Sequence, residues 1–150
     1  MKRTVSDEVG AENLISRVDQ LTADAMPIWG KMNPTEMLLH CNATNQAILN
    51  WEGKIRKATF RQKLMKFIWM NLMPNFPKNV KGVKKFDMKG LVDSGKFEEE
   101  RKTFIDLVRQ FPMLQQPLIS PHPFFGPLNT AEWGKVIWKH LDHHLRQFGV

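Results

Sequence analysis

Apolar residues recur along this chain at the three- and four-residue spacing of amphipathic helices. The pattern predicts four main helices, over 6–21, 33–51, 94–111 and 131–148, and a shorter one over 60–73. No stretch shows the apolar–polar alternation of a β-strand. Asn33-Pro34-Thr35-Glu36 is a strong helix start, because it supplies a cap residue, a proline and an acid in the first turn. The chain is therefore predicted to be all-α.

Two long segments connect these helices. The segment from Gly53 to Asp93 is interrupted by prolines and glycines and is predicted to cross over the helices. Within it, the 60–73 helix is expected to cover them with a set of apolar side chains: Leu64, Phe67, Ile68 and Leu72. The segment from Met113 to Asn129 contains four prolines and is predicted to be an extended loop.

The composition is that of one globular domain spanning 1–150. Hydrophobic residues make up 42% of the 150 residues and charged residues 25%, which allows a sizeable core. The stretch from Met1 to Val9 is charged, so no secretory signal is expected, and no apolar run is long enough for a transmembrane segment. The single Cys41 cannot form an internal disulfide. Together these features favour a cytoplasmic protein.

The net charge of +7 is concentrated in one segment. Between Lys54 and Lys89 there are eleven basic residues and one acid, Asp87, so this basic segment carries +10 and the rest of the chain −3. Such a segment can attract phosphate, an acidic partner or anionic lipid, and the alternative is an ordinary solvated connection. No nucleic-acid motif accompanies it, so nucleic acid is not an expected partner.

The last predicted helix carries histidines on its apolar face. At about 100° per residue, His140 and His144 fall within the arc of its apolar residues, while His143 falls at the edge. Two histidines one turn apart can bind one divalent ion. The alternative is a pair of core histidines that hydrogen-bond to buried water. On the 33–51 helix, His40 also points inward, which makes it a third inward histidine.

Two neighbours of His40 have candidate roles. Glu36 lies one turn earlier on the same side of the helix, where it serves either as part of the helix cap or in proton transfer beside a metal. Cys41 points about 100° away from His40, so we expect it to be a small core residue rather than a nucleophile.

The helix order and the histidine spacing resemble the DinB-like (YfiT-like) metalloprotein superfamily. Three segments carry the resemblance: Trp29-Gly-Lys-Met-Asn-Pro-Thr-Glu-Met-Leu-Leu-His-Cys41, His122-Pro-Phe-Phe-Gly126 and Trp138-Lys-His-Leu-Asp-His-His-Leu-Arg-Gln-Phe-Gly149. The resemblance implies a four-helix bundle with a long crossover between the second and third main helices. It also implies a divalent metal ion, zinc or nickel, bound by His40, His140 and His144. Three histidines and one open position suit a catalytic ion.

Known relatives in that superfamily include thiol-dependent transferases and isomerases, and hydrolases. The resemblance therefore implies a metal-dependent transferase that acts on a small organic substrate and uses a low-molecular-weight thiol. One alternative is a metal-dependent hydrolase. Another is a non-enzymatic binding module, whose basic segment meets an anionic partner. A homodimer is compatible with each of these functions.

The loops around the predicted metal define an expected substrate pocket. We expect the open side of the ion to face Trp29, Trp133 and the loop from His122 to Phe125, so that Phe124 and Phe125 form part of the wall. His122 is expected to contact the substrate or to transfer a proton, with Glu36 as the second candidate catalytic residue.

Overall fold

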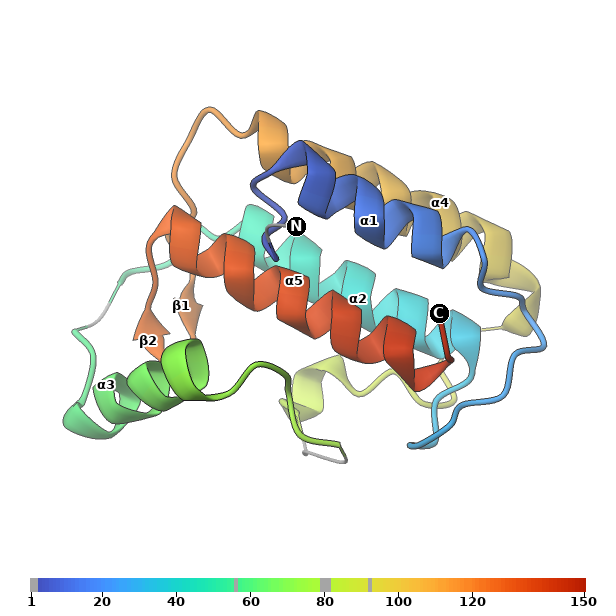
Figure 1. Ribbon diagram of the computed structural model, residues 1–150, viewed down its shortest axis with the longest axis horizontal. Coiled ribbons are helices and arrows are strands. Elements are labelled where there is room, and N and C mark those ends of the chain that lie inside the picture. Colours follow the sequence, from blue (N-terminus) through green and yellow to red (C-terminus); the bar gives the residue numbers. More distant parts are fainter. Residues whose placement is uncertain (1–2, 56, 79–81, 92) are drawn as a thin grey trace.

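The computed structural model describes residues 3–55, 57–78, 82–91 and 93–150, and the fold is mostly helical, as predicted. Its α-helices are α1 (Glu8–Val18), α2 (Pro34–Leu49), α3 (Phe60–Phe67), α4 (Phe97–Gln110) and α5 (Thr130–Gln147) (Figure 1). A π-helical turn, η1 (Ile68–Leu72), continues α3, and the 3-10 turns are η2 (Lys84–Phe86), η3 (Ser94–Lys96) and η4 (Phe111–Met113). No helix in these ranges is long and apolar enough to cross a membrane.

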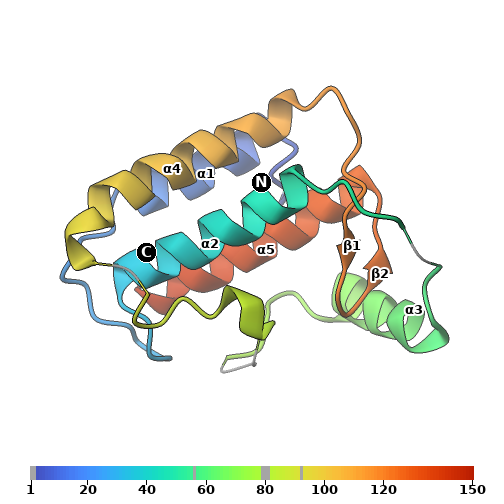
Figure 2. The same cartoon turned by 180° about the vertical axis from the view of Figure 1, so that it is seen from behind.

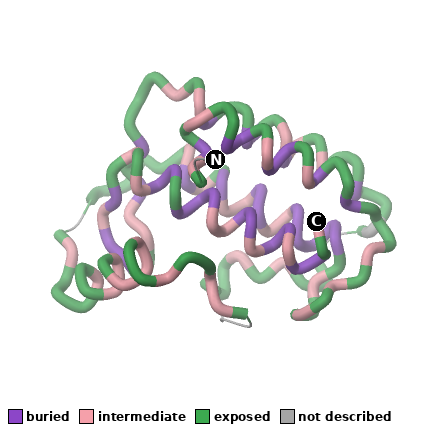
Figure 3. Tube along the Cα trace, viewed as in Figure 1, coloured by how far each residue is buried: buried purple, intermediate pink, exposed green. Residues whose placement is uncertain are grey.

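The four longer helices lie in two layers. Figures 1 and 2 show α1 beside α4 in one layer and α2 beside α5 in the other, with the crossover on the far side of α2 and α5. Buried side chains from all four helices fill the space between the layers: Leu14, Val18, Met37, Leu38, Phe104, Val108, Ile137 and Leu141. In Figure 3 the buried positions accordingly recur along the facing sides of these helices, and the exposed ones lie outside.

The helix starts follow the predicted capping chemistry. The Asn33 side chain accepts a hydrogen bond from the Glu36 backbone N–H, and Glu36 accepts one from the Asn33 backbone N–H. Asn129 and Glu132 form the same reciprocal pair at the start of α5. The Asp7 side chain caps α1, which ends at Val18, earlier than the predicted 21. Local side-chain chemistry therefore sets these starts.

A short hairpin corrects the expectation that the chain contains no strand. β1 (Pro121–His122) pairs antiparallel with β2 (Gly126–Pro127), so that His122 lies opposite Gly126. The strands are too short to show an alternating pattern, and their prolines favour a loop prediction. Gly126 has a φ of 71°, a left-handed conformation that glycine adopts without strain.

Several residues expected to be buried are exposed. Trp51 and Val9 continue the apolar spacing of the predicted 33–51 and 6–21 helices, but Trp51 lies beyond the end of α2 and Val9 faces solvent from α1. Leu64, Phe67 and Leu72 were expected to cover the other helices, but they are exposed, and a different set of crossover side chains packs against the core: Met65, Trp69, Met70 and Phe76. The 60–73 stretch is apolar on more than one side, so its sequence does not reveal which side turns inward.

Contacts with the N-terminal part of the chain hold α5 in place. The Trp138 indole N–H donates to the Gly10 carbonyl at 3.2 Å, and the Val5 N–H donates to the Gly134 carbonyl at 3.1 Å. Arg17 donates to Asp142 at 2.8 Å. A Cβ at position 134 would overlap nearby hydroxyl groups, so glycine permits this close approach. These contacts fix the helix that carries His140 and His144.

We expect Phe104→Ala to destabilise the protein far more than Phe60→Ala. Phe104 is fully buried between the layers, so its loss leaves a cavity that lowers the free energy of unfolding by about 3–5 kcal/mol. Phe60 is 82% exposed on α3, and its replacement should change that free energy by less than about 0.5 kcal/mol. Urea denaturation followed by circular dichroism measures both values, and similar losses would contradict the placement of α3 outside the core.

Candidate metal centre

Three histidines from α2 and α5 converge on one point. The ligand nitrogens of His40, His140 and His144 lie within 4.8 Å of one another, and the two Nε2 atoms of His40 and His140 are 3.1 Å apart. Nitrogens bound to one tetrahedral zinc ion, each at about 2.1 Å, are about 3.4 Å apart. The spacing fits a shared divalent ion, and the predicted convergence of the three histidines is confirmed.

Antiparallel packing of α2 and α5 produces this convergence. The Ile28 backbone N–H donates to the Gln147 carbonyl at 2.7 Å, which places the loop before α2 beside the end of α5, and Figures 1 and 2 show the two helices running in opposite directions. His40 lies early in α2, and His140 and His144 lie one turn apart in the second half of α5. The three rings therefore meet although His40 is a hundred residues from His140.

The backbone of the crossover orients His40. Its Nδ1 lies 2.6 Å from the Phe86 carbonyl oxygen, which can only accept a hydrogen bond. Nδ1 therefore carries the proton, and the neutral ring presents the lone pair of Nε2 to His140. Burial lowers the pKa of His40, which favours this neutral form.

A side-chain amide orients His144 in the same way. Gln147 donates from Nε2 to the Trp29 carbonyl at 2.7 Å, so its Oε1 is the atom that faces His144 Nδ1, at 3.1 Å. This oxygen accepts, and Nδ1 of His144 must donate. The remaining nitrogen, Nε2, keeps its lone pair for the cluster. Hydrogen bonds of this kind typically orient histidine ligands around metals.

The electrostatics keep the cluster neutral. Burial lowers the pKa of His144 to about 3 and holds that of His140 well below its ordinary value. Charge on the neighbouring imidazoles lowers both pKa values further, because one protonated ring disfavours another. At neutral pH each of the three rings is therefore neutral and keeps one unprotonated nitrogen, which a cation would bind well.

The three clustered histidines are not equally buried. His144 is buried, but His40 and His140 are only half-buried. Within the described part of the chain, the group of potential metal ligands comprises these three residues and no fourth. A tetrahedral ion bound here would keep one position for water or substrate, which is the arrangement of catalytic rather than structural zinc sites.

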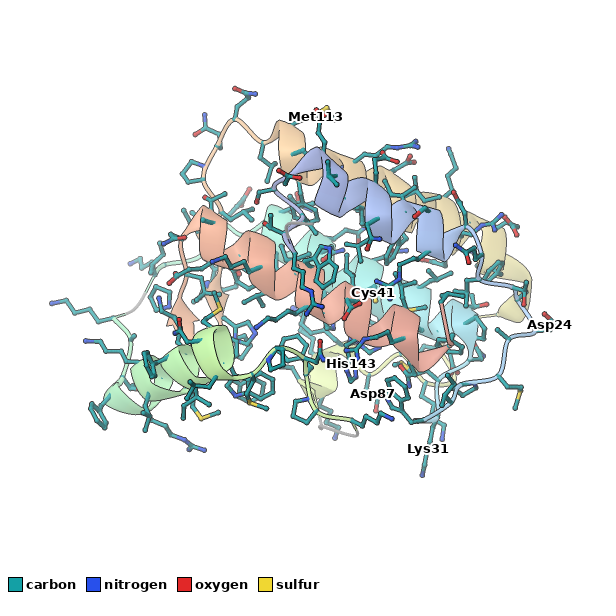
Figure 4. The ribbon with its side chains drawn as sticks, viewed as in Figure 1. Asp24, Lys31, Cys41, Asp87, Met113 and His143 are labelled. Carbon is teal, nitrogen blue, oxygen red and sulfur yellow. The ribbon has the colours of Figure 1, made fainter. Side chains whose placement is uncertain are left out.

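His143 lies beside the cluster without joining it. Its ring centroid is 5.2 Å from that of His144, and its edge contacts are with Trp29 and Phe76. Figure 4 labels His143 on the crossover side of α5. The negative charge of Asp87 acts on His40, where it favours the protonated ring and partly opposes the effect of burial.

Glu36 has both carboxylate oxygens engaged by backbone groups. Oε2 accepts from the Asn33 N–H at 2.9 Å, and Oε1 accepts from the Gly90 N–H across the crossover. The carboxylate thus completes the α2 cap. It also holds the crossover against α2 at Gly90, four residues after Phe86. This geometry favours the capping role of Glu36 over proton transfer.

The expected pocket residues do not all lie around the cluster. Trp29 is at the end of α5 that carries His144, whereas Trp133 is near its other end, seven residues or about 10 Å before His140. The His122 ring stacks on Phe125 at 4.1 Å and lies 5.6 Å from Trp133. Trp133 therefore lies ten residues, or about 15 Å, along α5 from the His143 ring that Trp29 contacts, and a rim shared by the two tryptophans stays a prediction.

The hairpin faces a different cavity from the cluster. A cavity of about 480 Å³ lies beside the hairpin and is lined by Trp51, Lys54, Lys57, Gln62 and His122 among others, and by none of the three clustered histidines. Phe124 is exposed at the tip, while Phe125 is buried. Trp69 and Phe76 lie between the two regions, since Trp69 contacts Phe125 and Phe76, and Phe76 contacts His140.

Sequence reasoning missed the groups that support the cluster. Gln147 left a weak signal, because it is a polar residue three positions after His144, on the buried side of α5. No sequence signal could identify the Phe86 carbonyl, since every residue carries a backbone carbonyl. Phe76 and Trp69 lie in the crossover, and helical periodicity does not reveal the contacts of a loop.

The family comparison covers nearly the whole chain. The family described as "Protein of unknown function (DUF1569)" matches residues 8–149. The chain belongs to this family. No curated protein and no solved structure matches it. Both ligand helices and the crossover between them lie within the matched residues, so the histidine cluster is part of a DUF1569 domain.

We expect replacement of His40, His140 or His144 by Ala to abolish stoichiometric binding of zinc to this DUF1569 chain. Each residue supplies one of three nitrogens, and two histidines hold zinc much more weakly than three. His143→Ala, one position from a ligand, is the matched control and should keep the metal. Elemental analysis after gel filtration measures the bound zinc. The assignment would be contradicted if His143→Ala lost its zinc while the other three variants kept theirs.

Gln147→Leu should lower zinc affinity by about 10- to 100-fold, because the His144 ring loses the acceptor that orients it. Gln46→Leu, at an exposed position of α2, is the control for the same change of side chain. A competition titration with a chromogenic chelator gives both affinities. Equal affinities would show that Gln147 does not support the site.

Proposed function

We propose that this chain is a divalent-metal-dependent enzyme that transfers a small organic group from an electrophilic substrate to the sulfur of a low-molecular-weight thiol, with release of the substrate's leaving group and of the thiol proton. The observation that carries the proposal is the convergence of three histidines, two of them only half-buried, with no fourth protein ligand among the described residues. A purely structural zinc site would close the coordination sphere with a fourth protein ligand.

In this proposal His40, His140 and His144 hold zinc or nickel. When bound, such an ion lowers the pKa of a coordinated thiol, so that the reactive thiolate exists at neutral pH. Trp29, Phe76 and His143 form an aromatic wall beside the cluster and exclude water from that side. Cys41 takes no part, because it is buried and burial raises the pKa of its thiol.

In this proposal His122 contacts a part of the substrate that extends from the cluster toward the hairpin. Its Nδ1 accepts from the Phe124 backbone N–H at 3.2 Å, and burial lowers its pKa to about 4. The neutral ring therefore carries its proton on Nε2 and can donate a hydrogen bond to a polar group of the substrate. Glu36 acts as a positioning residue, because its carboxylate holds the crossover beside His40.

The proposal includes the type of helical fold. We take α1, α2, α4 and α5 as a four-helix bundle of the DinB-like type, with α3 and η1 in the crossover between α2 and α4. The two layers and the position of the histidines support it. Small thiols are kept reduced in the cytoplasm, so the proposed reaction suits that compartment.

The test uses protein loaded with cobalt(II), which reports its ligands in its absorption spectrum. Addition of a low-molecular-weight thiol should produce a sulfur-to-cobalt charge-transfer band in the wild type and none in His140→Ala. The zinc or nickel form should then consume the thiol together with a chromogenic alkylating substrate. His122→Ala should keep the metal and the band but raise the KM for that substrate.

The proposal is contradicted if the cobalt protein shows no spectral change with thiols and no thiol-dependent turnover. Hydrolysis of chromogenic esters without a thiol would instead assign a hydrolase to the same site. A metal that stays bound with neither activity would leave a binding module.

A further inference from the structure

The outer side of α3 is an exposed apolar face. Phe60, Leu64 and Phe67 are 82%, 48% and 59% exposed. At about 100° per residue these three positions fall within about 60° of one another around the helix. Their side chains therefore form one stripe, which we call the α3 face, and no described residue of the chain buries it.

Basic side chains border the α3 face. Arg61 and Lys63 are exposed and lie on either side of the stripe by the same helical geometry. They belong to the basic segment between Lys54 and Lys89, which carries +10 in a chain of net charge +7. Figures 1 and 2 show that the crossover, which contains this segment, lies on one side of the molecule, away from α1 and α4.

The inner side of α3 and its continuation are anchored to α5. Lys66 forms an ion pair with Glu132 at 2.7 Å. Lys139 donates to the Trp69 and Met73 carbonyls at 2.9 and 2.8 Å, which satisfies acceptors at the end of η1. Met65 and Trp69 pack against the core. The α3 face is therefore held outward by contacts on the opposite side of the helix.

Charge and apolarity together restrict the partner. A second copy of this chain would bring two +10 segments together, which repel each other. Double-stranded nucleic acid would engage the basic side chains through its phosphates but would leave the apolar stripe in water. An anionic bilayer surface satisfies both features, because lipid headgroups attract the basic side chains while the apolar side chains enter the acyl boundary.

We propose that the chain binds peripherally to anionic lipid membranes, with the α3 face inserted into the interface. The contact is independent of the metal chemistry, since none of the three clustered histidines lies on α3. In this orientation α3 and η1 lie between the bilayer and the histidine cluster. Trp69 contacts Phe76, and Phe76 contacts His140.

The test measures co-flotation of the full chain with vesicles at low and high salt. Vesicles rich in phosphatidylserine should carry the protein at low salt, and pure phosphatidylcholine vesicles should carry far less. Combined replacement of Phe60, Leu64 and Phe67 by Ser should lower the partition coefficient at least about tenfold. The matched control combines Val9→Ser, on α1, with Met113→Ser, which Figure 4 labels on the side of the molecule away from the crossover; both residues are exposed and apolar, and this variant should bind as the wild type does.

A second readout locates the contact. Because Cys41 is the only cysteine and is buried, Leu64→Cys introduces a selectively reactive thiol. An environment-sensitive dye at position 64 should brighten and shift to the blue when phosphatidylserine vesicles are added. The same dye on Val9→Cys, on α1, should not respond.

Three results would overturn the proposal. They are equal binding to both kinds of vesicle, unchanged binding by the triple variant, and no vesicle binding by the folded wild type. Retention on a DNA column that survives the triple replacement, without vesicle binding, would reassign the basic segment to nucleic acid.

Discussion

Carbonyl oxygens behind two of the three histidines determine what the cluster can do. The Phe86 carbonyl and the Gln147 amide oxygen each accept from a ring Nδ1, so the lone pairs of His40 and His144 point to the same place. Without these acceptors the rings would be free to present N–H groups to one another, and the cluster would resemble an ordinary polar contact. Ligand geometry here depends on the second layer of hydrogen bonds.

These two acceptors come from different parts of the fold and tie it together. Gln147 is itself fixed by the Trp29 carbonyl, and Gly30, with a φ of 86°, leaves room for its amide. Phe86 is held near α2 because Glu36 binds the Gly90 N–H. The loop before α2, the crossover and the end of α5 therefore support one site, although each belongs to a separate stretch of sequence.

The crossover combines two roles that a simple connection would not have. On its inner side it supplies the Phe86 carbonyl and the aromatic contacts of Trp69 and Phe76 near the histidines. On its outer side it exposes apolar and basic side chains. The outer side chains are not part of the core between the helix layers, so they contribute little to the stability of the fold. Their apolar and basic groups are therefore available for binding.

The sequence by itself determined the elements whose causes are local. Helical periodicity, capping residues and the spacing of His140 and His144 act within a few positions, so the main helices, their starts and the inward histidines could be predicted. Tertiary packing decided the rest: the hairpin, the outward turn of α3, the position of Trp29 relative to Trp133 and the acceptors behind His40 and His144. Those features depend on contacts between segments that are distant in the sequence and on backbone groups that every residue carries. Neither produces a recognisable sequence pattern.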